Sequence, residues 1–366
     1  MKKVIAILIC VMLAGMVFAI EFKQDGVFRA RAAIYNDLNE EDGGHLDNRL
    51  QFGLNAELHE YLNMYGKVEI GNLTWGTDGG AITTSGVNIK TFELYIDYRI
   101  ESLMANVKIG QQWWSDHRGL ILNDTFSGIV FTMDNCMSFK TQVGWIKANE
   151  RWKNKSDDYN VFLINAQTDS PMPAGVLFMY GRDDNPAFEM SNITFMPYVT
   201  VKNDPIELDL TGFVDYQMYT SPIDSELSFG AAAKANMDLG MMQIGADILY
   251  VSEKGLTTLS PYYQNGLYIY GYGPHHDGVN LYWGNYNAPQ NANFLSAVAS
   301  VRMPLNDSMT AFGAFGLLID TGMEINAGIE INLIPDLLKL SGYGAYGIHE
   351  SETKNYMFGT TIKTSF

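Results

Sequence analysis

Strict alternation of apolar and polar residues is the feature that most constrains this chain. Between Arg49 and His59, leucine, phenylalanine and alanine occupy one side, and polar residues and glycine occupy the other. The same pattern returns at residues 92–100, 227–236 and 323–333. A period of two is typical of β-strands with one apolar face. Segments of about ten such residues are typical of strands that cross a membrane as part of a β-barrel.

The alternation predicts an all-β chain, a transmembrane antiparallel β-barrel of about eighteen strands, with sixteen as the alternative count. We expect strands near residues 26–35, 48–59, 64–72, 90–100, 104–113, 127–134, 138–148, 158–167, 173–181, 191–202, 205–217, 226–238, 241–252, 293–304, 307–319, 323–333, 337–348 and 355–366. The pattern fails at residues 161–164, where four apolar residues follow one another. Tight turns alternate with long polar connections, the longest at residues 253–292, as in outer-membrane barrels.

The first nineteen residues predict a cleaved signal peptide. Lys2 and Lys3 precede an apolar stretch over residues 4–18, and Val17 and Ala19 supply the small residues of a cleavage site. A membrane-spanning helix is the alternative, but it needs about 20 apolar residues. We therefore expect residues 20–366 to form one exported domain, the barrel.

Composition and motif spacing exclude several classes of function. A formal net charge of −17 over 366 residues argues against nucleic-acid binding, which needs a basic face. Two cysteines are too few for a disulfide scaffold or a cysteine-based metal centre. The acidic cluster at residues 40–42 and the His-His-Asp cluster at 275–277 lack the ligand spacing of a metal site. The His-Glu-Ser run at 349–351 lacks a group that would orient the histidine, so we expect no enzyme and no cofactor.

The polar faces of sixteen or eighteen strands would line an aqueous passage, and their charges would decide what passes. The expected pore-lining cations are Arg29, Arg31, Arg49, Lys67, Arg99, Lys108, Lys140 and Arg302. The interleaved carboxylates are Glu57, Glu69, Glu93 and Asp97, and a separate acidic sector contains Glu207, Asp209, Asp215, Asp247, Glu324 and Glu330. Two interpretations stay open: these charges pair across strands and keep the lumen wet, or the basic residues guide an anionic solute.

Residues 110–128 carry the most specific motif. They read Gly-Gln-Gln-Trp-Trp-Ser-Asp-His-Arg-Gly-Leu at 110–120 and Phe-Ser-Gly at 126–128. The segment resembles the alginate-export family of outer-membrane porins, which has a Gly-Arg-Gln strand end, an Asp-x-Arg-Leu-like loop and a Phe-Asp-Gly start to the next strand. The matching positions are Gly110, Gln112, Asp116, Arg118, Leu120, Phe126 and Gly128, and the departures are Gln111, Gly119 and Ser127.

The resemblance implies a passive channel for an alginate-like polyuronate or similar anionic saccharide, with Asp116 and Arg118 at the constriction. Gln111 replaces an arginine of the family, and this removes one of the guanidinium groups that carboxylates prefer. The alternatives are a general diffusion porin for small hydrophilic solutes and a plugged structural or adhesive barrel. Whether residues 253–292 plug the pore, bind sugar rings or pack on themselves stays open, as do oligomeric state and transport direction.

The last strand also alternates, and the chain ends on Phe366. A terminal aromatic residue resembles the assembly signal of Gram-negative outer-membrane proteins, which implies the barrel-assembly machinery as a partner. Lipid and lipopolysaccharide are the other expected partners, because the apolar faces of the strands would point outward. The sequence therefore predicts location in the outer membrane.

Overall fold

The computed structural model describes residues 21–36, 41–76, 88–136, 139–150, 157–170, 172–185, 189–220, 224–271, 278–279, 281 and 289–366, and the expected signal peptide lies outside them. The elements are β1 (Glu21–Asn36), β2 (Asp42–His59), β3 (Leu62–Thr74), β4 (Ile89–Ile100), the 3-10 helix η1 (Glu101–Leu103), β5 (Ala105–Ser115), β6 (Asn123–Cys136), β7 (Phe139–Asn149), β8 (Tyr159–Thr168), β9 (Ala174–Asp183), β10 (Met190–Asn203), β11 (Ile206–Tyr219), β12 (Glu226–Asp238), β13 (Gln243–Val251), β14 (Leu295–Asn306), β15 (Met309–Leu318), β16 (Gly322–Ile334), β17 (Leu338–His349) and β18 (Lys354–Ser365). In this part of the chain no helix is long and apolar enough to cross a membrane.

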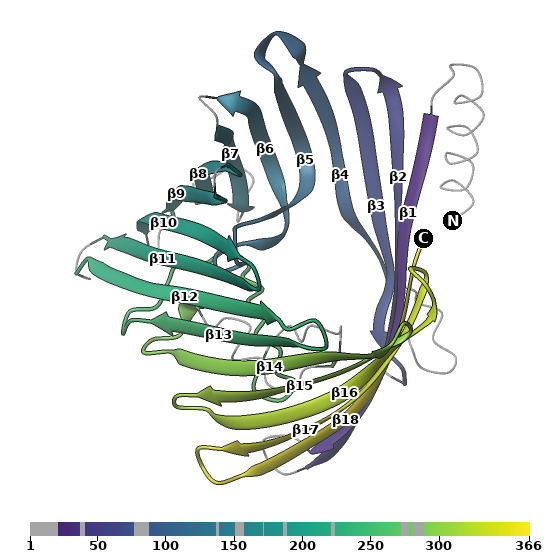
Figure 1. Cartoon of the computed structure of the whole chain (residues 1–366). Coiled ribbons are helices and arrows are strands. Elements are labelled where there is room, and N and C mark those ends of the chain that lie inside the picture. The colour runs from purple at the N-terminus through teal and green to yellow at the C-terminus, as the bar shows by residue number, and fades with distance from the viewer. Residues whose placement is uncertain are drawn as a thin grey trace.

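The strands form one closed antiparallel barrel of eighteen strands, so the predicted fold and the higher of the two strand counts are confirmed. Each strand pairs with the next in the chain, and β1 also pairs with β18, with Val27 opposite Ser365 and Tyr35 opposite Met357. The strands follow one another in chain order around the barrel (Figure 1). Closure leaves no strand edge exposed, which is the condition for a sheet to cross a bilayer.

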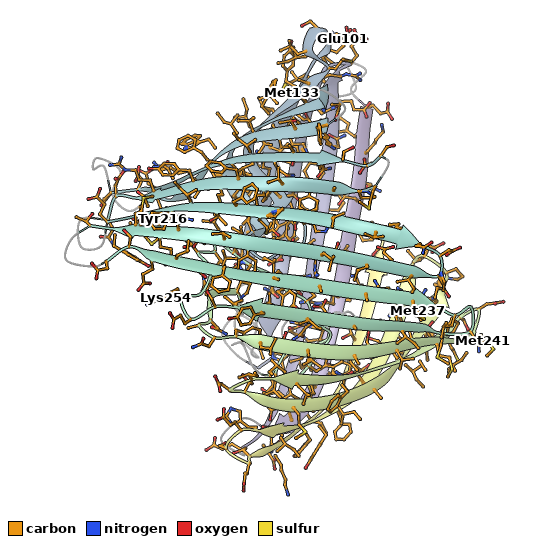
Figure 2. The ribbon with its side chains drawn as sticks, turned by 60° about the vertical axis from the view of Figure 1, so that its left-hand side comes forward. Glu101, Met133, Tyr216, Met237, Met241 and Lys254 are labelled. Atoms are coloured by element: carbon orange, nitrogen blue, oxygen red, sulfur yellow. The ribbon has the colours of Figure 1, made fainter. Side chains whose placement is uncertain are left out.

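The outward face of the barrel is apolar. Phe162 is 50% exposed, and Leu227 and Ile325 are both 57% exposed. Exposing large apolar side chains to water is unfavourable by about 25 cal/mol per Å², so such a face is stable against lipid. Met237 and Met241 lie at one end of the β12–β13 hairpin and Lys254 at the other (Figure 2). A closed barrel with this exterior belongs in an outer membrane.

The four consecutive apolar residues at 161–164 lie in β8, and the structure explains their lack of alternation. Phe162 and Ile164 point outward and are exposed, whereas Val161 and Leu163 point inward and are buried. The two inward residues belong to the same buried cluster as Leu120. Both faces of this strand are therefore apolar, because one faces lipid and the other belongs to the cluster buried inside the barrel.

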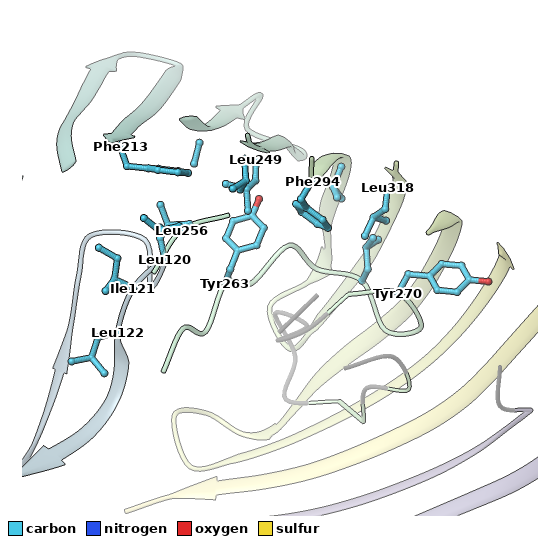
Figure 3. Packing of buried hydrophobic residues seen from close by; sticks show 14 of the residues in the cluster. Leu120, Ile121, Leu122, Phe213, Leu249, Leu256, Tyr263, Tyr270, Phe294 and Leu318 are labelled. Atoms are coloured by element: carbon cyan, nitrogen blue, oxygen red, sulfur yellow. The ribbon is translucent and has the colours of Figure 1, made fainter. Parts of the chain in front are cut away.

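Two segments fold into the barrel and pack against wall residues such as Phe213, Leu249 and Leu318 in this internal cluster (Figure 3). One is the β5–β6 connection, residues 116–122, which we call the tip. The other is the described beginning of the β13–β14 connection, residues 252–271, which we call the inner segment. Backbone hydrogen bonds join them: Tyr262 N donates to Gly119 O at 2.9 Å, and Leu259 N donates to Ile121 O at 2.9 Å. The barrel is thus narrowed from within by two segments that support each other.

Gly110 of β5 is required by the backbone of the wall. Its φ of +133° lies in a region that side chains disfavour, and a Cβ here would sit 2.3 Å from the Leu94 carbonyl oxygen. We expect Gly110→Val to lower the free energy of unfolding by at least about 1–3 kcal/mol from backbone strain alone. Urea unfolding in detergent measures this loss. Gly342→Ala is the control, because a Cβ there would meet nothing within 4 Å, and equal stability of the two variants would contradict the prediction.

Candidate functional site

The narrowed part of the lumen is a cavity of about 1140 Å³ bounded by the barrel wall, the tip and the inner segment. Its lining contains six lysine and arginine residues and three carboxylates, although the whole chain is strongly acidic. The cations are Arg29, Arg31, Arg49, Lys67, Arg118 and Lys234, and the carboxylates are Glu93, Glu207 and Asp209. This constriction is therefore a basic region inside an acidic protein.

Strands β1 and β2 supply Arg31 and Arg49 to a basic wall, and the carboxylates paired with these two arginines are more buried than the arginines are. Arg31 donates to Asp47, whose side chain is 5% exposed, and His45 contacts the same carboxylate at 2.7 Å. Arg49 lies 3.8 Å from Glu69, which is likewise buried. The two carboxylates orient the arginines without lining the cavity themselves. At these two arginines the surface that a solute meets is consequently cationic.

The sequence placed Asp116 at the constriction, but its carboxylate turns away from the cavity. It is buried and accepts four backbone N–H groups of its own loop: Arg118 at 3.1 Å, Leu120 at 3.0 Å, Ile121 at 2.7 Å and Leu122 at 2.8 Å. A carboxylate satisfied in this way holds the turn in shape. Asp116 is thus a structural residue that positions the tip, and the expectation that it lines the pore is wrong.

The guanidinium of Arg118 reaches from the tip to the opposite wall. It donates to Asp247 of β13 at 2.7 Å, lies 3.6 Å from Asp209 of β11 and stands 5.7 Å from the centre of the Tyr263 ring. Tyr263 donates its hydroxyl to the same Asp247. Burial, reinforced by this carboxylate, raises the pKa of Tyr263 well above its ordinary value, so the phenol stays protonated. The Arg118 side chain therefore lines the cavity and also holds the tip against the barrel wall.

The neighbouring His117 makes a second attachment of the tip to the wall. Its ring stacks on Tyr198 of β10, with centroids 4.0 Å apart and planes 9° apart, and its Nε2 contacts Asp209. Asp209 also accepts from the Thr200 hydroxyl at 3.2 Å. The Asp209 carboxylate thus contacts two adjacent residues of the tip, His117 and Arg118.

Three carboxylates of the wall hold the inner segment. Glu324 of β16 is fully buried and accepts the backbone N–H groups of residues 268, 269 and 270 at 2.8, 2.9 and 3.0 Å. Asp215 of β11 accepts from Thr257 N at 2.9 Å, and Asp247 accepts from Tyr263. Part of the expected acidic sector is therefore structural. These anchors make residues 252–271 a fixed part of the lumen.

Most of the tyrosines described in the inner segment pack inward. Tyr263, Tyr268 and Tyr270 are fully buried, and Tyr268 stacks on Tyr343 of the wall at 4.0 Å. Tyr262 lines the cavity. For the buried three, the alternative that the aromatic residues pack the segment is confirmed. The remaining aromatic residues of the connection and the cluster at 275–277 lie outside the described residues.

The other expected pore residues are dispersed along the lumen. Asp97 of β4 lies opposite Lys108 of β5, Lys108 stands 4.8 Å over the Tyr95 ring, and Asp97 and Tyr95 line a separate cavity of about 390 Å³. Arg99 lies near the short-turn end, and Arg302 lies 3.5 Å from Glu330 on another wall. Within the described ranges no three His, Cys, Asp or Glu side chains are grouped so that they could hold a metal ion.

Lys234 of β12 lines the constriction but was not among the expected site residues. It lies opposite Asp209 and Asp247 on its two neighbouring strands. The alternation of residues 227–236 already placed it on the polar face. What the alternation could not show is which of many polar-face residues lie at the level of the tip.

The chain matches no family model and no curated protein sequence. Its fold is similar to that of solved structures from Pseudomonas aeruginosa. The structure of OpdK with vanillate has a TM-score of 0.63 at 11% identity, that of OccK2 (OpdF) in complex with glucuronate 0.61 at 10%, and that of OccK9 (OpdG) 0.65 at 8%. Each comparison covers 94% of this chain and 98% of the other. At these identities the likeness shows a common barrel fold.

Proposed function

We propose that this protein is a passive outer-membrane channel for small organic acids, with uronic acids and short acidic saccharides as its preferred solutes. The observation that carries the proposal is the basic wall of β1 and β2, where the carboxylates paired with Arg31 and Arg49 are more buried than the arginines are. An aqueous passage lined in this way lowers the energy of an anion at the narrowest point. Arginine suits a carboxylate because its two N–H groups match the two oxygens.

The fold comparisons support the same solute class. The structures with vanillate and glucuronate contain molecules that join one carboxylate to a ring. The present cavity of about 1140 Å³ has room for such a molecule together with water. The resemblance of residues 110–128 to alginate exporters favours uronates within this class. We also propose lipid, lipopolysaccharide and the barrel-assembly machinery as partners, the last through Phe366.

Ion selectivity in planar bilayers tests the proposal. We expect the native protein to prefer chloride over potassium under a KCl gradient and to be blocked by glucuronate. Arg118→Ala leaves Asp209 and Asp247 without their shared cation, and we expect it to lower the chloride-to-potassium permeability ratio about two- to tenfold. Arg118→Lys keeps the charge and is the control, with a ratio close to native.

Three results would contradict the proposal in different ways. Cation selectivity that Arg118→Ala leaves unchanged would indicate a general diffusion porin. Anion selectivity without block by any uronate would contradict the proposed preference for uronic acids and acidic saccharides. A folded barrel that conducts no ions would indicate a plugged structural barrel.

A further inference from the structure

A second cavity, of about 390 Å³, lies in the lumen toward the short-turn end of the barrel. The first four strands form it, close to the short turns that join β2 to β3 and β4 to β5. Tyr65 and Tyr95 line it, whereas Lys67 and Glu93, two residues further along the same strands, line the constriction. Two residues of a strand span about 6.7 Å, so this cavity adjoins the constriction along the wall. We call it the tyrosine cavity.

The charged groups of the tyrosine cavity have partners of opposite sign. Its one lysine, Lys23, donates to Glu57. Of its two carboxylates, Asp25 lies 3.8 Å from the Lys67 ammonium, and Asp97 lies opposite a lysine of β5. The constriction has twice as many cations as carboxylates in its lining, but here the charges are compensated. The tyrosine cavity therefore favours an uncharged ligand over an anion or a cation.

The two tyrosine rings form an aromatic surface, with centroids 5.3 Å apart and planes 37° apart. The Tyr65 hydroxyl donates to Asp25 of β1 at 2.8 Å, and a Cβ added at Gly53 of β2 would collide with that hydroxyl. The Tyr65 ring thus reaches from β3 across β2 along the wall and turns one face to the lumen. The Lys108 ammonium already stands 4.8 Å from the centre of the Tyr95 ring, so Tyr65 offers its face to a ligand.

Uncharged hydrogen-bonding groups lie beside the rings. Asn55 of β2 is opposite Tyr65, and Asn63 of β3 is opposite Asp97. No hydrogen bond joins either side-chain amide to another residue in the part of the chain that the structure describes. Each amide offers two N–H donors and one carbonyl acceptor. An aromatic face edged by amides and a carboxylate suits a sugar ring, whose C–H groups pack on the aromatic face while its hydroxyls hydrogen bond at the edge.

We propose that the tyrosine cavity binds neutral monosaccharides in their pyranose form, with the sugar ring stacked on Tyr65. The hydroxyls exchange hydrogen bonds with Asn55, Asn63 and Asp97. This ligand lies outside the proposed function, because it carries no charge, whereas the solutes of the constriction are acids. The lumen then has two adjoining sites of different chemistry, one for a carboxylate and one for an uncharged sugar ring.

Block of single-channel current by glucose in planar bilayers tests the proposal, with sorbitol as an open-chain polyol of similar size. We expect glucose to bind native channels about tenfold more tightly than sorbitol, which has no ring face to stack and loses more conformational freedom. Tyr65→Ala should weaken glucose block about tenfold, the effect of losing one well-placed aromatic contact. Tyr65→Phe keeps the ring and should retain most of the block. Tyr346→Ala removes an exposed tyrosine from the lipid-facing side of β17 and should leave the block unchanged.

A cationic ligand is the alternative occupant, and Asp97→Asn distinguishes it. The variant removes the negative charge but keeps an acceptor oxygen, so glucose block should persist. Native channels should bind choline less tightly than glucose, because the carboxylates of the cavity have cationic partners. Tighter block by choline that Asp97→Asn abolishes would identify a cation site and overturn the proposal.

The remaining outcomes separate this site from the proposed function. Equal block by glucose and sorbitol, or native glucose block in Tyr65→Ala, would overturn the tyrosine cavity as a sugar site and leave anion selectivity and glucuronate block untouched. Equal losses in Tyr65→Ala and Tyr346→Ala would overturn it as well. Glucose block that depends on Tyr65 in a channel that glucuronate does not block would support the sugar site and contradict the proposed function. Heat-modified mobility on gels confirms that each variant forms a barrel.

Discussion

Glucuronate block is expected to weaken about ten- to a hundredfold when Arg29 and Arg49 are both replaced by glutamine. The two guanidinium groups face the constriction from adjacent positions on β1 and β2. A hydrogen bond to a charged group contributes about 1.5–3 kcal/mol, which corresponds to a factor of roughly ten to a hundred in affinity. Titration of single-channel block in planar bilayers measures this change directly.

A matched control separates this local effect from total charge. Arg182→Gln with Lys254→Gln also removes two cations, but both side chains are exposed at the rim and paired with Asp184 and Glu226. We expect native block in this control. The prediction is contradicted if the control weakens block as strongly as the Arg29 and Arg49 variant. In the native protein the affinity of glucuronate block should also fall as the salt concentration rises, because dissolved ions screen the cationic surface.

Release of the inner segment is the second large effect, and it is expected from Glu324→Ala. The native carboxylate accepts three consecutive backbone N–H groups at positions 268–270 and the Asn326 amide at 3.0 Å. Without the carboxylate, three buried N–H groups lose their acceptor. Each unsatisfied group costs about 1–3 kcal/mol of free energy, and the three costs need not add in full. We expect a higher and noisier single-channel conductance, since the segment occupies the lumen. Limited proteolysis near Leu267 should become faster.

Graded substitutions make this prediction specific to the carboxylate. Glu324→Gln keeps one acceptor oxygen, so its conductance should lie between native and Glu324→Ala. Glu226→Ala removes a rim carboxylate and should leave conductance and proteolysis unchanged. If Glu324→Ala forms a barrel with native conductance and native protease resistance, then other contacts, such as the Tyr268–Tyr343 stack, suffice to hold the segment.

Much of the barrel was predictable from period-two alternation. The expected range 226–238 coincides with β12, and the range 323–333 lies within β16. The alternation succeeds because lipid selects one face and water the other along the whole strand. At residues 161–164 it fails, because Val161 and Leu163 belong to a buried cluster inside the barrel that includes residues distant in sequence.

The functional site was less predictable from the sequence, because residues with similar positions in a strand or motif play different roles in it. Glu324 and Glu330 lie on the same face of β16, yet the first anchors the inner segment and the second contacts Lys339 and Arg302. Asp116 and Arg118 belong to one motif, yet the first is turned into its loop and the second reaches the far wall. Neither difference is visible in spacing, since both depend on backbone groups brought in from elsewhere.

The sequence by itself determined the strands, their number to within one hairpin, and which side chains face lipid, because these follow from local alternation. Only the tertiary structure decided which polar side chains line the constriction and which are buried as anchors. It also decided that Arg29 lies beside Lys363, residues at opposite ends of the chain. Register and closure are set by hydrogen bonds between distant strands and by the packing of inserted segments. These interactions leave no periodic trace in the chain itself.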